Sequence, residues 1–403
     1  MARVLSAVGD ALRLWWVQVA LVFIASRVVA TAIILVHAAQ QIANPWTGAS
    51  PDYVAFSGFW DAEWYLRVAL AGYPTELPVD ADGNVGENAW AFMPAYPFLV
   101  AFLALVTSVP FQIVAVWVSI ACAAGAAFVY YRLFATWLPQ GSAVAAVALM
   151  LFNPISPLLQ LGYAESMHLL LLGVCLLLLV RRRYWAMLPW IVLMSFTRPS
   201  GLAFALAMAG HVALRWWRHR RHGEPYPRRE LAGSLAAGVV SAASGLAWTL
   251  IAAIATGRLD AYTETEFAWR RPYVGDVPFV PFAPWFQGGA WWAEWNALPA
   301  WVGVVAVLVI VALVAAALLS PWMRRLGADL RIWVAAWFVY LLAVFFPQSS
   351  TWRLLLPASP ALAALAVPRS KWLVAGGIVL GVVGQWMWLG GLWAWHEHHW
   401  TPP

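Results

Sequence analysis

Long apolar runs, broken by short polar turns, recur along the whole chain. A helix that crosses a bilayer needs about 20 mostly apolar residues. The pattern predicts an all-α polytopic membrane protein with about eleven transmembrane helices (range 10–12), built as one domain over residues 1–403. The candidate spans lie at about residues 14–39, 110–131, 141–160, 165–180, 184–197, 201–213, 231–255, 299–320, 332–346, 354–367 and 371–393.

Two segments between the spans are longer than a simple connection requires. Residues 40–93 and 256–298 are rich in tryptophan, tyrosine, proline and carboxylates. Loops of more than about 15 residues are usually functional or disordered, and aromatic-rich segments are not typical of disorder. We interpret the apolar stretch at 94–108 as a helix that lies along or dips into the outer face. The first outer loop, with its juxtamembrane helices, is therefore 40–109.

The distribution of charge orients these segments. Charged residues make up 10% of the chain, against about 25% in soluble domains. Basic residues concentrate at 214–230, 181–183, 324–325 and 369–371. The positive-inside rule places these segments in the cytoplasm, which predicts a cytoplasmic N-terminus, an outward C-terminus and outer loops on the extracytoplasmic face of the plasma membrane. The same rule accounts for the net charge of +6, so we expect no nucleic-acid partner.

The stretch "GFWDAEWYLRVALAGYP" (58–74) places two acids among aromatic residues. Its composition predicts a helix from Phe59 to about Ala71. Ser57 or Gly58 suits the cap at the start of this helix, because small or hydroxyl side chains favour that position. This helix follows directly after the first candidate span, so we expect it at the border between water and lipid.

Spacing on this helix separates its two acids. Glu63 and Arg67 are four residues apart, so we expect them to pair. Asp61 would then be unpaired in the first helical turn. An acid there either caps an interfacial helix or takes part in chemistry, and the spacing does not choose between them. The aromatic residues around these acids are Trp60, Trp64 and Tyr65.

A second polar segment, "NPISPLLQLGYAES" (153–166), turns on the same predicted face. It places Glu165 and His168 near the membrane surface. Ionisable residues at such depths are functional candidates by default. Glu165 equally suits the acidic first turn of the helix that follows.

The segment 184–213 has arginines at both ends, which predicts a hairpin of two short helices that turns at "TRPSG" (197–201). Arg198 stands at this turn. An arginine so placed needs a partner, either a carboxylate such as Glu165 or the phosphate of a ligand. Arg27, inside the first span, needs a buried acid or carbonyl for the same reason.

The segment "FFPQSSTWRLLLPASP" (345–360) makes a third turn on this face. Arg353 begins the next apolar run, with Ser349, Ser350 and Thr351 beside it. Hydroxyls and an arginine at a helix start suit a phosphate group. The alternative is an arginine that extends to the membrane interface.

Asp61, Glu165, Arg198 and Arg353 all face outward in this topology. Acids and arginines at one membrane face, with aromatic loops above them, suit a reaction on a phosphate-bearing lipid and a sugar. The terminal "HEHHW" (396–400) contains several histidines, but such clusters at a chain end are often adventitious. We therefore expect no metal site and no required cofactor.

Several motifs, in order along the chain, resemble the PIG-V-like family of GPI mannosyltransferase II and its bacterial relatives. This family belongs to the GT-C class of membrane glycosyltransferases. The motifs span most of the chain and are "WDAEWYLRVALAGY" (60–73), "AFMPAYPFLV" (91–100), "NP" with "YAES" (153–154, 163–166), "TRPSG" (197–201) and "WRLLLP" (352–357).

The resemblance implies transfer of mannose from a polyprenyl-phosphate carrier, with inversion, on the extracytoplasmic face. Asp61 occupies the position of the catalytic base, and Arg353, then Arg198, would bind the donor phosphate. Glu165 would orient the acceptor hydroxyl or hold an arginine. His168, Glu63 and the three aromatic neighbours of Asp61 would help to position the substrates. A glycolipid, a lipoglycan and a protein all remain open as acceptor.

Two other classes of function stay open at this point. A transporter or lipid flippase would use Arg27, Glu165 and Arg198 as a charged path. A membrane scaffold would use its long loops to bind partners.

Overall fold

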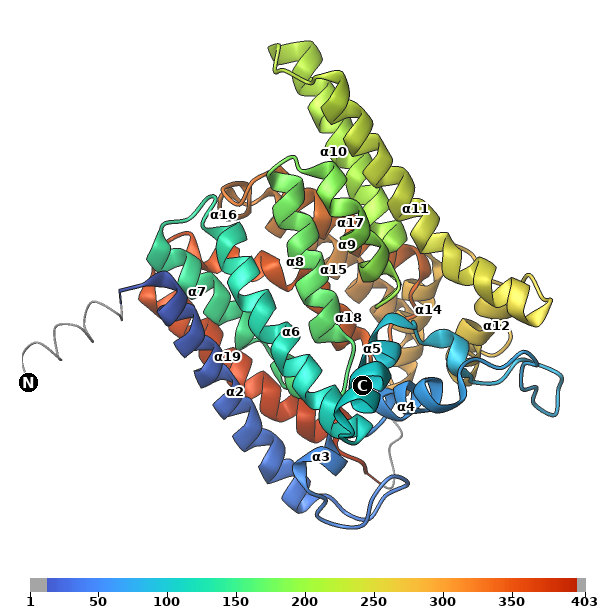
Figure 1. Ribbon diagram of the computed structural model, residues 1–403. Helices are drawn as coiled ribbons and strands as arrows, with labels where there is room; N and C mark the ends of the chain where they lie inside the picture. Colours follow the sequence, from blue (N-terminus) through green and yellow to red (C-terminus); the bar gives the residue numbers. More distant parts are fainter. Residues whose placement is uncertain (1–12, 397–403) are drawn as a thin grey trace, which may run out of the picture.

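The computed structural model describes residues 13–396 and is all-helical apart from one β-bridge between Val79 and Val85. Long helices form a bundle, and shorter helices gather at one end of it (Figure 1). The bundle helices are α2 (Trp15–Gln40), α6 (Phe111–Phe134), α7 (Gln140–Leu151), α8 (Glu165–Val180), α9 (Tyr184–Ser195), α10 (Gly201–His222), α11 (Arg228–Thr256), α15 (Ala300–Leu319), α17 (Ala328–Val344) and α19 (Lys371–Trp388).

Five helices are long and apolar enough to cross a membrane: α2, α6, α11, α15, and α19 together with the following turn η4 (Leu389–Trp393). Several other apolar helices have 10–17 residues. The prediction of an all-α polytopic membrane protein is thus confirmed, whereas eleven spans are not. The first residues of the chain and most of "HEHHW" lie outside the described residues, and so do the predictions on the N-terminus and on this cluster.

Two predicted spans differ from the observed helices because of proline. The span predicted at 354–367 consists of a short helix, α18 (Thr351–Leu354), and a 3₁₀ segment, η3 (Leu356–Ala366). The span predicted at 141–160 divides into α7 and the 3₁₀ turn η2 (Ser156–Gln160). Proline lacks an N–H group and clashes with the preceding turn, so an α-helix does not run through such segments.

Helices of the two long loops lie over one end of the bundle. The first loop contains α3 (Tyr53–Phe56), α4 (Asp61–Ala71), η1 (Ala89–Ala91) and α5 (Ala95–Thr107), and the second contains α12 (Ala261–Ala268), α13 (Arg271–Val274) and α14 (Ala283–Trp295). Asn88 donates to the Thr265 hydroxyl at 2.8 Å, and Arg271 donates to the Val85 carbonyl oxygen at 2.7 Å. The loops therefore pack against each other and form a common cap. A last short helix, α16 (Pro321–Arg324), follows α15.

The predicted hairpin is formed by α9 and α10, with its turn at residues 196–200. Glycines let α10 approach α11 closely. A Cβ atom on Gly245 would lie 2.7 Å from the Leu202 nitrogen and 3.0 Å from the Gly201 carbonyl carbon. These distances are shorter than real Cβ contacts, so the glycines set the separation of the two helices where α10 begins.

We expect Gly245→Ala to destabilise the protein, because α10 and α11 must move apart. Overpacking of this kind costs about 1–3 kcal/mol. Gly238→Ala on the same helix is the matched control, since its Cβ would lie at an ordinary 3.6 Å from Met208. Alanine favours a helix over glycine by about 1 kcal/mol in both variants. Thermal unfolding in detergent measures the difference, and equal melting temperatures would contradict the close contact.

Candidate active site

Asp61 begins α4 and is buried. The preceding residue, Trp60, has φ +58° and ψ −121°, which a bulky side chain rarely adopts. The Trp60 indole donates to the Trp393 carbonyl oxygen at 2.8 Å, and the Asp61 backbone N–H donates to the Tyr163 hydroxyl at 3.0 Å. Surrounding contacts thus hold a strained turn, as is common at functional sites.

The predicted cap of this helix is wrong. Neither Ser57 nor Gly58 caps α4, which begins two residues after Phe59. The Ser57 hydroxyl instead donates to the Val54 carbonyl oxygen at 2.7 Å, within the turn that ends α3. The predicted helix end at Ala71 is confirmed.

Two arginines and a second carboxylate meet Asp61. Arg353 Nη1 donates to Asp61 Oδ2, and Arg198 Nη1 lies 3.8 Å from the same oxygen. Arg198 Nη2 lies 3.2 Å from Glu165 Oε1, so the expected carboxylate partner of Arg198 is confirmed. None of the four side chains is more than 15% exposed. We call these four residues the charge cluster; its two positive and two negative formal charges balance each other.

The prediction that Asp61 is unpaired is therefore wrong. Spacing within one helix identifies partners on that helix alone. Arg353, however, lies 292 residues further along the chain. The pairing predicted on the same grounds for Glu63 and Arg67 is confirmed, at 3.1 Å. That pair lies on the more exposed side of α4.

Two further predicted residues support the charge cluster. The Tyr65 hydroxyl accepts a hydrogen bond from Arg198 Nη1 at 3.3 Å and is fully enclosed. His168 Nε2 lies 2.9 Å from the Ser200 hydroxyl oxygen, which ties α8 to the turn that carries Arg198. Both contacts fix the position of the arginine.

A cavity of about 410 Å³ opens beside the charge cluster. All four members of the cluster line it, together with His168. Most of its remaining lining is apolar and comes from α10, α11, α12 and α17, for example Leu202, Leu246, Phe267 and Leu341. We call it the inner cavity; it combines an end lined by paired charges with a hydrocarbon-like wall.

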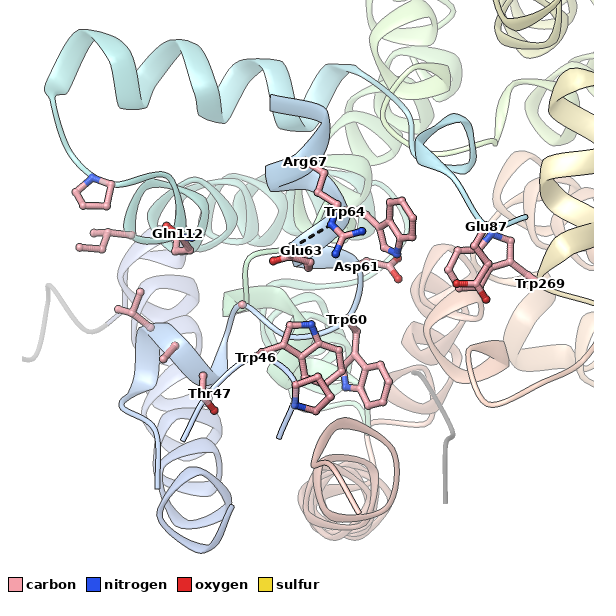
Figure 2. A pocket seen from close by; sticks show the side chains of 16 residues that line it. Trp46, Thr47, Trp60, Asp61, Glu63, Trp64, Arg67, Glu87, Gln112 and Trp269 are labelled. Carbon is pink, nitrogen blue, oxygen red and sulfur yellow. Dashed lines mark hydrogen bonds and ion pairs between the residues drawn. The ribbon is translucent and has the colours of Figure 1, made fainter. Parts of the chain in front are cut away.

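A second, more open cavity of about 650 Å³ lies on the other side of Asp61. Figure 2 shows the indoles of Trp46, Trp60, Trp64 and Trp269 around it, with Glu63 and Arg67 paired at its side. We call it the aromatic cavity. Asp61 and Trp269 line both cavities, so they form part of the boundary between them.

A third cavity, of about 1240 Å³, is predominantly apolar. It lies among α14, α15, α17 and the end of the chain, with Trp285, Ile310 and Phe338 in its wall. Gln348 lines this cavity and the inner cavity. The three hydroxyl residues predicted beside Arg353 are divided between the two cavities. Ser350 lines the inner cavity, and Ser349 and Thr351 line the third one.

Glu266, on α12, is a site residue that the sequence patterns missed. Its side chain keeps accessible surface toward the inner cavity, which Tyr262 on the same helix also lines. Enclosure by protein raises the pKa of Glu266 above its ordinary value, although Arg198 and Arg353 oppose that shift. The four-residue spacing of Tyr262 and Glu266 was a usable signal, but nothing in the sequence indicated that α12 folds back over the bundle.

Arg27 lies apart from the charge cluster. It donates to the Ser156 and Leu151 carbonyl oxygens at 3.0 and 3.3 Å. Carbonyls are one of the two kinds of partner expected for it, and they come from the last residue of α7 and from the segment that follows it. Arg27 thus completes the hydrogen bonding of a broken helix. A charged path from Arg27 to Arg198 is not formed by these contacts.

Metal ligands do not gather in the part of the chain that the structure describes: residues 13–396 contain no group of three or more histidine, cysteine or acidic side chains suited to a metal ion. His396 lies 2.6 Å from the Gly390 carbonyl oxygen. The charged side chains that line the inner cavity are carboxylates and arginines.

No family model and no curated protein matches this chain. Three similar solved structures are oligosaccharyltransferases of the archaeon Archaeoglobus fulgidus. The first, a complex with zinc and sulfate, is 16% identical, with a TM-score of 0.46 over 93% of this chain and 54% of the other. The second, a complex of AglB with an inhibitory peptide and a dolichol-phosphate, is 13% identical, with a TM-score of 0.43 over 94% and 56%. The third, tethered to an acceptor peptide, is 13% identical, with a TM-score of 0.40 over 90% and 54%. The chain spans about half the length of these structures.

Proposed function

We propose that the protein is an inverting membrane glycosyltransferase that moves a sugar, mannose by the family resemblance, from a polyprenyl-phosphate donor to an acceptor hydroxyl. The observation that carries the proposal is the place of Asp61. This carboxylate lines two cavities of different chemistry, with Arg353 and Arg198 beside it. A transfer between a lipid-borne sugar and a second substrate needs this arrangement of a base between two binding spaces.

The inner cavity suits the donor. Its arginines provide the charge that a phosphate diester and a leaving phosphate require, and its apolar wall suits the first units of a hydrocarbon chain. Gln348 lines both this cavity and the third one, so the third, predominantly apolar cavity adjoins the donor site and suits the remaining hydrocarbon chain. The donor phosphate would then lie at the charge cluster.

The aromatic cavity suits the acceptor. Trp46 and Trp60 pack with ring centroids 4.7 Å apart, and Trp64 and Trp269 lie 6.1 Å apart at the other side. Indole faces bind the apolar faces of sugar rings, and the carboxylates of Glu63 and Glu87 accept hydrogen bonds from hydroxyl groups. A carbohydrate acceptor therefore fits this space.

The proposed reaction follows from these placements. The acceptor oxygen attacks the anomeric carbon from the side of Asp61, and its proton passes to that carboxylate. The bond between the anomeric carbon and the phosphate oxygen breaks, and polyprenyl phosphate leaves with the bonding electrons. Arg353 and Arg198 stabilise the additional negative charge on the phosphate, so the leaving group needs no proton.

The ion pair of Asp61 with Arg353 predicts the order in which the two substrates bind. In the structure the carboxylate that acts as base is held by the arginine that is proposed to bind phosphate. A donor phosphate competes for Arg353 and weakens its hold on Asp61. Donor binding thus releases the Asp61 carboxylate from this ion pair, and the acceptor reacts second.

We expect Asp61→Asn to lower kcat by at least about 10²-fold, because an amide accepts no proton from the acceptor. The measurement is transfer from radiolabelled polyprenyl-phosphate mannose in membranes, per amount of folded protein. Asp82→Asn is the matched control, since Asp82 is an exposed acid of the same loop that lines none of the three cavities, and it should retain most activity. Normal transfer by a folded Asp61→Asn variant would exclude the assigned base.

Arg353→Gln should raise the KM for the donor and weaken inhibition by the product polyprenyl phosphate, because one positive charge at the phosphate position is lost. Arg67→Gln removes an arginine that pairs outside the charge cluster and serves as the control. Initial-rate kinetics with both substrates varied should also show that the donor binds first. An unchanged KM for the donor with a raised KM for the acceptor would place the phosphate elsewhere.

Glu266→Gln tests the residue in the inner cavity. A carboxyl whose pKa is raised in the folded protein binds its proton more tightly there than in the unfolded chain. Its stabilising effect is therefore present at low pH and is lost as pH rises through the raised pKa. We expect Glu266→Gln to melt at a higher temperature than the unsubstituted protein at pH 8 but not at pH 4. If the carboxylate binds donor hydroxyls, the same variant has a higher KM for the donor. A melting difference that is independent of pH would contradict the enclosed carboxylate.

A further inference from the structure

The end of α10, the start of α11 and the turn between them, residues 215–230, project beyond the neighbouring helices (Figure 1). We call this segment the basic arm. Its end of the molecule is opposite to the charge cluster, because α10 begins beside Arg198 and runs away from it for 22 residues. The basic arm has no part in the proposed reaction.

The rise per residue of an α-helix gives the distance of the basic arm from the charge cluster. The helices α8 and α10 both begin at the Glu165–Arg198 pair. At about 1.5 Å per residue, Arg181 at the end of α8 and Trp216 on α10 both lie roughly 22–24 Å from that pair. An ion pair of 3.9 Å between Arg182 and Glu230 joins the two places. Residues 218–229 therefore extend about 9 Å further.

A buried arginine organises the tip of the basic arm. Arg215 is 3% exposed and pairs with Glu224 at 3.2 Å and with Glu230 at 2.8 Å. It also donates to the Pro225 carbonyl oxygen at 2.8 Å and lies 4.9 Å from the ring centroid of Tyr226. Arg215 thus pairs with both acids of the basic arm, while Arg182 also lies near Glu230, and these contacts give the turn a defined shape.

The other arginines of the basic arm have no acidic partner among the described residues. None of them forms an ion pair with a residue between 13 and 396, and four are exposed to solvent: Arg220, Arg221, Arg228 and Arg229. Next to them, Trp216 and Trp217 are 45% and 52% exposed. The tip thus presents concentrated positive charge directly beyond a pair of indoles.

We propose that the basic arm binds anionic phospholipid headgroups of the leaflet at this end of the protein. Indoles prefer the border between lipid and water, so Trp216 and Trp217 mark the membrane surface at the depth of Arg181. The exposed arginines lie within two helical turns of that border, where they reach lipid phosphates. Guanidinium groups bind phosphate through paired hydrogen bonds, and positive segments beside a membrane attract anionic lipids.

Orientation of the chain during insertion does not by itself explain this structure. Orientation requires positive charge on one side, and an unstructured loop provides it equally well. The basic arm instead buries one arginine, which pairs with both of its acids and fixes the turn. A surface dominated by arginine, with little apolar area beyond two indoles, fits a lipid surface better than a protein partner.

The test compares two full-length variants that lose the same charge. Each is reconstituted into vesicles of equal parts phosphatidylcholine and phosphatidylglycerol and re-extracted, and the retained lipids are counted by native mass spectrometry. Arg215 is unchanged in both, so the tip keeps its fold, which a melting curve checks. The arm variant replaces Arg220, Arg221, Arg228 and Arg229 with glutamine, and the control variant replaces Arg324, Arg325, Arg369 and Lys371 with glutamine.

The unsubstituted protein and the control variant should retain phosphatidylglycerol over phosphatidylcholine, and the arm variant should bind it at least about tenfold more weakly. High salt should reduce the retention as the charges are screened. Equal retention by the two variants, or no preference for phosphatidylglycerol in the unsubstituted protein, would overturn the proposal. Binding of soluble polyglutamate without a preference for anionic lipid would assign the basic arm to an acidic protein and overturn it as well.

Discussion

The pairing of Asp61 with Arg353 is the interaction on which the rest of the site depends. It joins the first loop to a turn near the end of the chain, and Arg198 connects it to Glu165. A buried charge without its partner costs several kcal/mol, so none of these segments can move alone. In the proposed reaction the same charges also serve the donor, because a phosphate can replace a carboxylate as the partner of an arginine. The stability of the fold and the proposed binding of the donor phosphate thus depend on the same side chains.

Sequence patterns predicted the features that depend on residues close together in the chain. Apolar runs located most of the bundle helices, Gly72 ended α4 as expected, and the four-residue spacing identified the pair of Glu63 and Arg67. Charged groups that need partners also led to Arg198 and Glu165, because an arginine at a short turn has few ways to be neutralised. These inferences require knowledge of one or two neighbouring helices and no more.

The inferences that failed depend on contacts between distant segments. Asp61 looked unpaired because Arg353 belongs to another part of the chain, and the cap at Ser57 failed because α3 uses that hydroxyl. Glu266 was overlooked because the fold-back of α12 has no signature in composition. Two predicted spans are not continuous α-helices because proline divides the apolar run, and a hydropathy pattern contains no information on a missing N–H group.

The end of the chain has a consequence for the time at which the site exists. Trp393 donates to the Phe56 carbonyl oxygen at 3.1 Å and accepts from the Trp60 indole, so the turn before Asp61 is held by one of the last helical residues. Synthesis proceeds at about 5–20 residues per second, which separates Asp61 from Arg353 by roughly 15–60 s. A ribosome-bound or prematurely terminated chain therefore has the acid without its arginine or its clamp. The turn that carries Asp61 is therefore clamped only after Trp393 has been made, more than 300 residues after the acid itself.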